Sequence, residues 1–319
     1  PIAKYTPVTP PTVSPTVPTL PASGPNDDYA MTTGGSTGVY FAIGNGIAAA
    51  VRNVSNAGFI ISDVATSQGS VQNAQRLRAD DHQLATMQND VLYEAYNGEG
   101  RFAGGAITEL RAVGSLYSEL IQIVTLQSAN INSVAGLAGK RVVVGAAGSG
   151  AAINAGDVIN ASGVSMDVQY LDLSTGLDRL RDGAVDAVFW TGGIPTGAIT
   201  SLATTSPVRI VPIDETIKNA LLAQRPFYAN ATLPAGTYNG QAEAVETVAV
   251  RAVLVARSDV AADDVFRLLG IIYEGQDVKR SHAQGQNIRL EDAFLGVSGV
   301  PWHDGATAYF TSKGMTPPS

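Results

Sequence analysis

The stretch from Met31 to Arg52 joins a short apolar run to a loop of glycine and hydroxyl residues, and then to a helical pattern. The loop, Thr32 to Tyr40, alternates three glycines with four serine or threonine side chains. Backbone N–H groups at a helix start are unpaired and lie at the positive end of the helix dipole, so this junction suits an anion. It lacks the Lys-Ser/Thr of a P-loop and does not fit GxGxxG with its acidic residue, which makes a nucleotide an unfavoured anion. A simple chain reversal explains such a turn equally well.

The same order of strand, small polar loop and helix recurs along the chain. Phe59 to Val64 and Gln83 to Gln88 predict strands that are followed by helices over Val71 to Arg78 and Asn89 to Tyr96. Further on, the loop Ala146 to Gly150 again opens a helix. In an open parallel sheet, loops at the carboxyl ends of strands lie on one edge, where ligands bind. We therefore expect two α/β blocks whose loops share a cleft.

The segment between the two blocks contains two apolar runs. Leu110 to Leu116 and Leu120 to Leu126 predict two separate strands, joined around Tyr117, Ser118 and Glu119.

Composition limits the class of protein. A chain of 319 residues that is 45% hydrophobic and 15% charged can bury sizeable cores and form about two lobes. The formal net charge of -8 argues against a nucleic-acid partner or an anionic membrane surface, because both require basic patches. Cysteine is absent, which excludes disulfides and thiolate chemistry. No apolar run reaches the roughly 18 to 20 residues of a membrane helix.

Residues 1–25 are rich in Pro, Thr, Val and Ser and carry one charge. This composition predicts an extended linker of polyproline type, suited to tethering at a surface, with a disordered end of no particular role as the alternative. The chain starts at Pro1 without a signal peptide, so export would require one that has been removed.

Candidate catalytic and metal-binding residues are few. His82, His282 and His303 are scattered and none has a metal-ligand partner at helical spacing, so we expect no metal site. Ser149 occupies a strand-to-helix turn but lacks the GxSxG frame of a hydrolase, which favours a helix cap or ligand donor. Tyr40 and Trp190 lie near loop ends, where they belong either to the core or to a pocket.

Six segments in order resemble a TAXI-type solute receptor of TRAP transporters: TTGGSTGVY (32–40), TSQGSVQN (66–73), QNDVLYEAYNG (88–98), LRAVGSLYSELIQIV (110–124), INSVAGLAGKRVVVGAAGSG (131–150) and WHDGATAYF (302–310). The resemblance implies a type II periplasmic-binding-protein fold, an α/β fold of two lobes around a ligand cleft. Lobe I would comprise 26–117 plus 214–319, and lobe II 118–213. It further implies a protein that is not an enzyme, needs no cofactor, works outside the cytoplasm and passes a small carboxylate to membrane-embedded permease subunits.

The same resemblance implies the ligand-binding residues. They are Gly35, Ser36, Thr37, Tyr40, Thr66, Ser67, Gly69, Ser70, Asn73, Gln88, Asn89, Asp90, Tyr117, Gly148, Ser149, Gly150, Trp190, Thr191 and Gly192. The chain departs from the family at two points. Ala151 and Ala152 stand where the family usually has Thr-Glu, and Gln68 replaces a smaller residue in the second loop.

These observations favour a receptor for glutamate, glutamine, 2-oxoglutarate or a similar acid in a TRAP-type uptake system. A sensory module that uses the same cleft to signal to a membrane partner is the first alternative. A serine-dependent hydrolase using Ser149 is the second.

Overall fold

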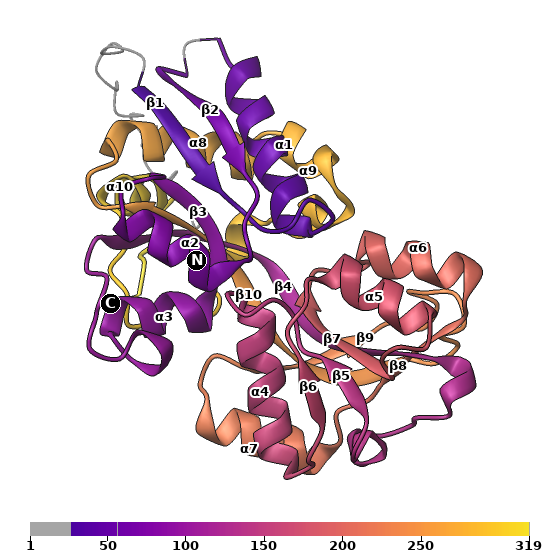
Figure 1. Ribbon diagram of the computed structural model, residues 1–319. Coiled ribbons are helices and arrows are strands. Elements are labelled where there is room, and N and C mark those ends of the chain that lie inside the picture. The colour runs from indigo at the N-terminus through magenta and orange to yellow at the C-terminus, as the bar shows by residue number, and fades with distance from the viewer. Residues whose placement is uncertain (1–26, 56, 319) are drawn as a thin grey trace, which may run out of the picture.

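The computed structural model describes residues 27–55 and 57–318, so the predicted linker over 1–25 lies outside the described residues. One sheet runs through the molecule in the order β2-β1-β3-β10-β4-β7-β5-β6, with β8 paired to β4 and β9 paired to β10. Figure 1 shows that helices divide around this sheet into two bodies, which we call lobe I and lobe II.

Lobe I contains β1 (Asp27–Thr32), β2 (Phe59–Ala65) and β3 (Leu84–Gln88) as parallel neighbours. Alternate side chains of a strand point to opposite faces, and here Leu84 joins the core beneath α1 (Val39–Asn53) while Ala85 joins the core beneath α2 (Ser70–Arg78) and α3 (Asn89–Asn97). Because the three strands are parallel, the loop that follows each of them lies at the same edge of the sheet.

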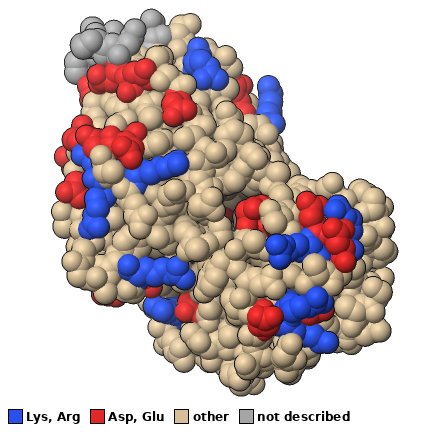
Figure 2. All heavy atoms as spheres, viewed as in Figure 1, with Lys and Arg blue, Asp and Glu red and all other residues tan. Residues whose placement is uncertain are grey.

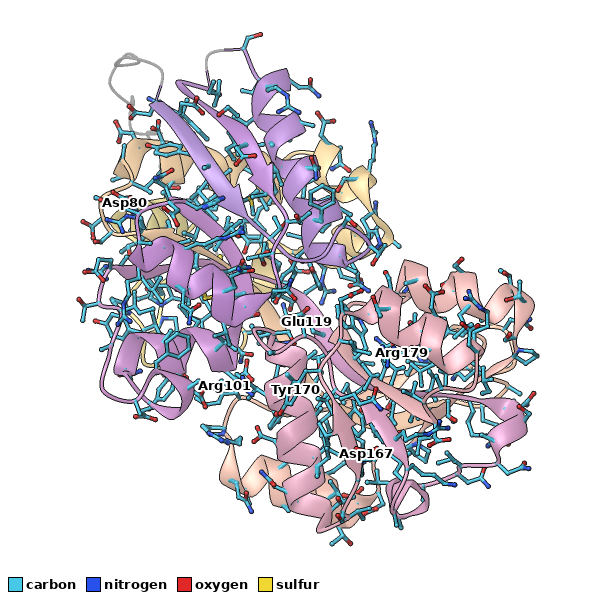
Figure 3. The ribbon with its side chains drawn as sticks, in the orientation of Figure 1. Asp80, Arg101, Glu119, Asp167, Tyr170 and Arg179 are labelled. Carbon is cyan, nitrogen blue, oxygen red and sulfur yellow. The ribbon has the colours of Figure 1, made fainter. Side chains whose placement is uncertain are left out.

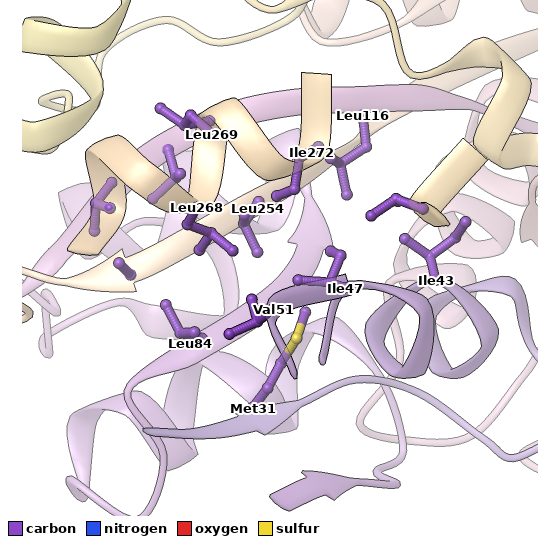
Figure 4. Packing of buried hydrophobic residues seen from close by; sticks show 14 of the residues in the cluster. Met31, Ile43, Ile47, Val51, Leu84, Leu116, Leu254, Leu268, Leu269 and Ile272 are labelled. Carbon is purple, nitrogen blue, oxygen red and sulfur yellow. The ribbon is translucent and has the colours of Figure 1, made fainter. Parts of the chain in front are cut away.

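The core beneath α1 follows from helical spacing. Ile43, Ile47 and Val51 recur every four residues, so they share one face of α1 and are buried. Figure 4 shows these side chains between the sheet and the apolar face of α8 (Ala262–Glu274), which includes Leu268 and Ile272. This packing holds α1 in the core of lobe I.

Lobe II has the parallel strands β5 (Arg141–Val143), β6 (Asp167–Gln169) and β7 (Ala187–Gly192), with β8 (Val208–Val211) beside β4. The helices α4 (Gly150–Ser162) and α5 (Leu173–Arg181) follow β5 and β6 as the sequence predicts. The chain also forms elements that we did not predict: α6 (Gly197–Thr205), α7 (Glu215–Gln224), β9 (Ala229–Leu233) and α9 (Asp277–Ser281). The short helix α10 (Asp304–Ser312) closes lobe I near the C-terminus.

The prediction of two strands within 110–126 is wrong, because β4 (Leu110–Leu126) is one strand of 17 residues. Its first half pairs with β10 (Val245–Arg257) and its second half with β7. The polar residues around Ser118 and Glu119 suggested a turn, but they occupy the part of the strand that passes between the lobes. There, the pairing with β10 continues through both residues.

Two long strands thus connect the lobes. Strand β10 pairs with β9 near Val245 and with β3 near Val255. Residues of α7 and the first half of β10, such as Ile217 and Val250, pack in the same core as Phe189 of lobe II. We therefore propose to place the return crossing within β10 instead of at residue 214, which gives lobe I as 27–117 plus 251–318 and lobe II as 118–250.

Candidate functional site

A cavity of about 520 Å³ lies between the two lobes and is lined by both. Figure 2 shows a hollow between the two bodies of the molecule, and Figure 3 places Glu119 between them. Most of the predicted site residues line this cavity: Gly35, Ser36, Thr37, Tyr40, Thr66, Ser67, Gly69, Ser70, Gln88, Ser149, Gly150, Trp190, Thr191 and Gly192. Tyr40 and Ser149, which are distant in sequence, face the same space.

Four helices begin at the cavity, but they differ in how their first N–H groups are paired. In lobe II, the Ser149 hydroxyl accepts from Ala152 N at 3.1 Å, and Asp172 accepts from Thr175 N at 3.0 Å. In lobe I, α1 and α2 start after glycines and have no side-chain cap. The first turns of α1 and α2 therefore leave N–H groups for an anion, apart from Gln72 N of α2, which donates to the Gly148 carbonyl.

Gly69 shows why the loop before α2 requires glycine. Its φ of +116° lies in a region that other residues rarely adopt, and an added Cβ would lie 3.3 Å from Ser149 Cα in the opposite lobe. The loop thus approaches lobe II closely at the edge of the cavity.

Direct contacts join the lobes beside the cavity. The hydroxyls of Thr37 and Ser174 lie 3.1 Å apart, and Gln72 N donates to the carbonyl of Gly148 at 3.3 Å. Arg101 also donates to the carbonyl of Ala147 at 3.0 Å. The loops before α1 and α2 therefore meet lobe II in this structure, as expected of a closed cleft.

Glu119 is a lining residue that our sequence prediction did not include. Its side chain is buried, with 3% of the residue exposed, and it accepts a hydrogen bond from the Tyr40 hydroxyl at 2.7 Å. Burial raises the pKa of Glu119 to about 8, although the bond from Tyr40 opposes the rise. The predicted turn around Glu119 conceals its position, because only a continuous strand fixes the face on which this side chain lies.

Arg76 is the second lining residue that was missed. It is the sole basic side chain among the described residues that line the cavity. Its Nη1 donates to the Thr32 hydroxyl and to the Thr66 carbonyl, both at 2.9 Å. These bonds hold the guanidinium beside the loops that precede α1 and α2. The sequence signal for Arg76 is its helical spacing from Ser70 and Asn73, because residues three apart share a face of the helix.

Other lining residues come from the predicted loops or just beyond them. Gln68, named as a departure from the family, lines the cavity, as does Ala151 at the other departure. Asp172, Leu173 and Ser174 at the start of α5 were not predicted.

Five predicted residues lie outside the lining: Asn73, Asn89, Asp90, Tyr117 and Gly148. Asn73 is fully buried and supports the loops, because its amide accepts from the hydroxyls of Thr32 and Ser67 and donates to the carbonyls of Thr33 and Thr86. Gly148 contributes the carbonyl that Gln72 contacts.

The remaining three lie behind the cavity. Asn89 donates to the Gly296 carbonyl at 2.9 Å and accepts from Arg251 N, which ties α3 to β10. Asp90 accepts from the Asn154 amide of α4 at 2.8 Å, so it bridges the lobes. Tyr117 is completely buried in the core of lobe I.

The geometry around Ser149 is that of a helix cap. Its Oγ donates to the Ala146 carbonyl at 2.7 Å, and no histidine is among the described residues that line the cavity. Within 27–55 and 57–318, no group of three or more His, Cys, Asp or Glu side chains could hold a metal ion. None of the helices in those ranges has the length and apolar character to cross a membrane.

Solved structures with the same architecture are found at low sequence identity. A protein from Bordetella bronchiseptica RB50 matches 90% of this chain and 81% of its own, with a TM-score of 0.53 and 14% identity. A putative L-cystine ABC transporter from Listeria monocytogenes matches 83% and 99%, with a TM-score of 0.50 and 14% identity. The periplasmic aliphatic sulphonate binding protein from Escherichia coli matches 82% and 74%, with a TM-score of 0.49 and 13% identity.

The first two of these likenesses confirm the predicted mixed α/β fold. At the level of sequence, the profile of the NMT1-like family matches residues 31–314, which is nearly the whole described chain. The chain belongs to the NMT1-like family.

Proposed function

We propose that the protein is an extracytoplasmic solute receptor of the TAXI type, which binds a small carboxylate and delivers it to the permease of a TRAP transporter. The carrying observation is the convergence of two uncapped helix starts, those of α1 and α2, with Arg76 on one cavity between the lobes. Backbone N–H groups and a guanidinium are the donors that carboxylates prefer.

The cavity also limits the size of the ligand. A volume of about 520 Å³ is within the usual range for a small-molecule site. Ala151 offers only a methyl group where related receptors usually have a hydroxyl residue. We therefore expect the ligand carboxylate to contact the lobe I loops and Arg76, and glutamate, glutamine and 2-oxoglutarate are the first ligands to test.

Titration calorimetry on refolded, ligand-stripped protein tests the proposal. We expect one of these acids to bind, and Arg76→Gln to weaken binding by about tenfold or more through loss of a charged donor. Arg78→Gln is the matched control on the same helix, because Arg78 donates to the Ala106 carbonyl at 2.9 Å and does not line the cavity. Binding of no small carboxylate, or equal effects of the two variants, would contradict the proposal.

The transport partner is a separate question. A TRAP system requires a multi-spanning permease gene beside this one and uptake that depends on an ion gradient. An adjacent ATPase gene would indicate a different transporter class, and a neighbouring sensor kinase gene would favour the signalling alternative.

The hydrolase alternative predicts turnover that disappears in Ser149→Ala. We expect no turnover of esters or amides by either protein, because the Ser149 hydroxyl is committed to capping α4. Hydrolysis by the wild type that this variant lacks would reverse the assignment.

A further inference from the structure

We propose that Glu119 and Gln88 form an acceptor subsite that selects ligands carrying a protonated amino group beside the carboxylate. The site would thus prefer an α-amino acid to the same acid without its amino group. This inference rests on the proposed function, because it adds a second recognition element to the same cavity.

Glu119 has spare capacity to accept hydrogen bonds. An ionised carboxylate offers about four acceptor positions, yet among the described residues its partner is the Tyr40 hydroxyl alone. No ion pair within that part of the chain includes Glu119. A buried carboxylate without a cation is costly unless a ligand supplies the missing charge.

The nearest arginine on the adjacent strand does not fill this role. In the register of β4 and β10, Glu119 lies opposite Val250, whereas Arg251 lies opposite Ser118. Since successive side chains alternate between faces, Arg251 projects from the opposite face of the sheet. It donates there to the hydroxyls of Ser115 and Ser118.

Gln88 provides a second acceptor in the same cavity. Its Oε1 is buried and has no hydrogen-bond partner among the described residues. The amide lies at the start of α4 in lobe II, since a Cβ added to Gly150 would overlap it. An ammonium group between Glu119 and Gln88 would satisfy both acceptors, because it carries three donors.

Trp190 supplies the complementary observation on the lobe II side. Its indole Nε1 is buried and finds no partner within 27–55 and 57–318, and this group can only donate. The lining of the cavity therefore combines acceptor capacity at Glu119 and Gln88 with donor groups at Trp190 and at the starts of α1 and α2. A zwitterion matches both sets, whereas a dicarboxylate matches only the donors.

The charged and titratable groups around Glu119 agree with this assignment. Tyr40 donates to it from α1, Tyr117 lies two residues before it on β4, and the charge of Asp90 on α3 acts on it from behind the cavity, while Arg251 lies beyond the sheet. Burial raises the pKa of Glu119 to about 8, so most of its carboxyl groups are protonated at pH 7. Glu119 must lose this proton when the ammonium group of a ligand binds. A second ligand carboxylate would instead require that proton to stay.

Calorimetry with glutamate and glutarate tests the proposal, because the two acids differ only in the amino group. We expect wild-type protein to bind glutamate about 10- to 100-fold more tightly than glutarate. Glu119→Gln should abolish this preference by weakening glutamate and sparing glutarate. Equal affinities in the wild type, or an unchanged preference in the variant, would overturn the proposal.

A second measurement needs no variant. Titrations at pH 7 in buffers of different ionisation enthalpy report proton exchange, and we expect proton release when glutamate binds. Proton uptake would overturn the proposal. If Glu119→Gln does not fold, this measurement still tests the proposal, because it uses the wild-type protein.

The outcomes separate this inference from the proposed function. Tight binding of glutarate with no preference for glutamate would leave the carboxylate receptor intact and refute the Glu119 subsite. Binding of butylamine but of no acid, abolished in Glu119→Gln, would refute the carboxylate receptor and retain the amine-binding role of Glu119. If neither the acids nor the amine bind, both the carboxylate receptor and the Glu119 subsite are refuted.

Discussion

Asp90 gives the strongest prediction about pH and stability. It lies in the first turn of α3, where its carboxylate accepts from Val91 N and from the Asn154 amide of α4, both at 2.8 Å. The same Asn154 amide donates to the Tyr228 hydroxyl at 3.0 Å. Asp90 is therefore a buried acid at the contact between the lobes, and we expect Asp90→Asn to stabilise the protein at alkaline pH.

The size of the effect follows from the pKa. Burial raises the pKa of Asp90 from 3.8 to about 7, against the opposing hydrogen bonds from Val91 and Asn154. One pKa unit corresponds to about 1.4 kcal/mol, so the rise corresponds to about 4 kcal/mol. The folded state binds this proton more tightly than the unfolded chain does. Stability is therefore lost as pH increases from about 4 to about 7, and the loss is complete above that range.

Urea unfolding of wild type and Asp90→Asn at pH 4.5 and pH 8 measures this difference. At pH 8 the variant should gain up to about 4 kcal/mol, while at pH 4.5 the two should agree within about 1 kcal/mol. The new amide can pair with Asn154 Oδ1, which has no partner in the described structure. Asp167→Asn, on the exposed start of β6, is the control and should change stability little at either pH. A variant no more stable than wild type at pH 8, or equally shifted at both values, would refute the reasoning.

Two further pairs of variants test the closed cleft and the core. In calorimetry, Gly150→Ala should weaken ligand binding by about tenfold, because the new Cβ overlaps the Gln88 amide. The control on the same helix is Gly156→Ala, whose new Cβ meets nothing within 4 Å of the described structure. It should leave binding unchanged and add about 0.5–1 kcal/mol of stability in urea unfolding. Ile47→Ala should lower the free energy of unfolding in urea by about 2–5 kcal/mol, since Ile47 is fully buried. Val54→Ala, at a 43% exposed position, should lower it by under about 0.5 kcal/mol. Similar losses in the two variants would contradict the assigned core.

The sequence predicted the parts of the fold that depend on local pattern. The helix after the first glycine loop was expected over Val39 to Val51 and extends over Val39–Asn53, because apolar spacing and turn residues agree there. The break predicted around Ser118 was wrong, because Ser118 and Glu119 belong to one continuous strand, where Ser118 accepts from Arg251 and Glu119 lines the cavity. Whether such polar residues form a turn or continue a strand depends on their place in the tertiary structure, which the local sequence pattern does not show.

The site was predictable where backbone loops form it, and less so where single side chains complete it. Glycine-rich loops indicate helix starts, so lining residues such as Ser36 and Ser70 could be predicted. Arg76 and Glu119 lie on regular elements whose orientation toward the cavity depends on packing against the rest of the lobe. Asp90 resembled a site residue in sequence, yet α3 directs it toward α4 behind the cavity.

The position of Glu119 links recognition to closure. It lies on β4 where the strand passes between the lobes, and its partner Tyr40 is in the first turn of α1 in lobe I. Trp190 and Gly150 face the same cavity from lobe II. A ligand held by both sides gains its full set of contacts only when the lobes are together, and a ligand shifts a conformational equilibrium only by its differential affinity for the two states. Glutarate, which would leave the acceptors of Glu119 and Gln88 unsatisfied, should therefore favour closure less than glutamate does.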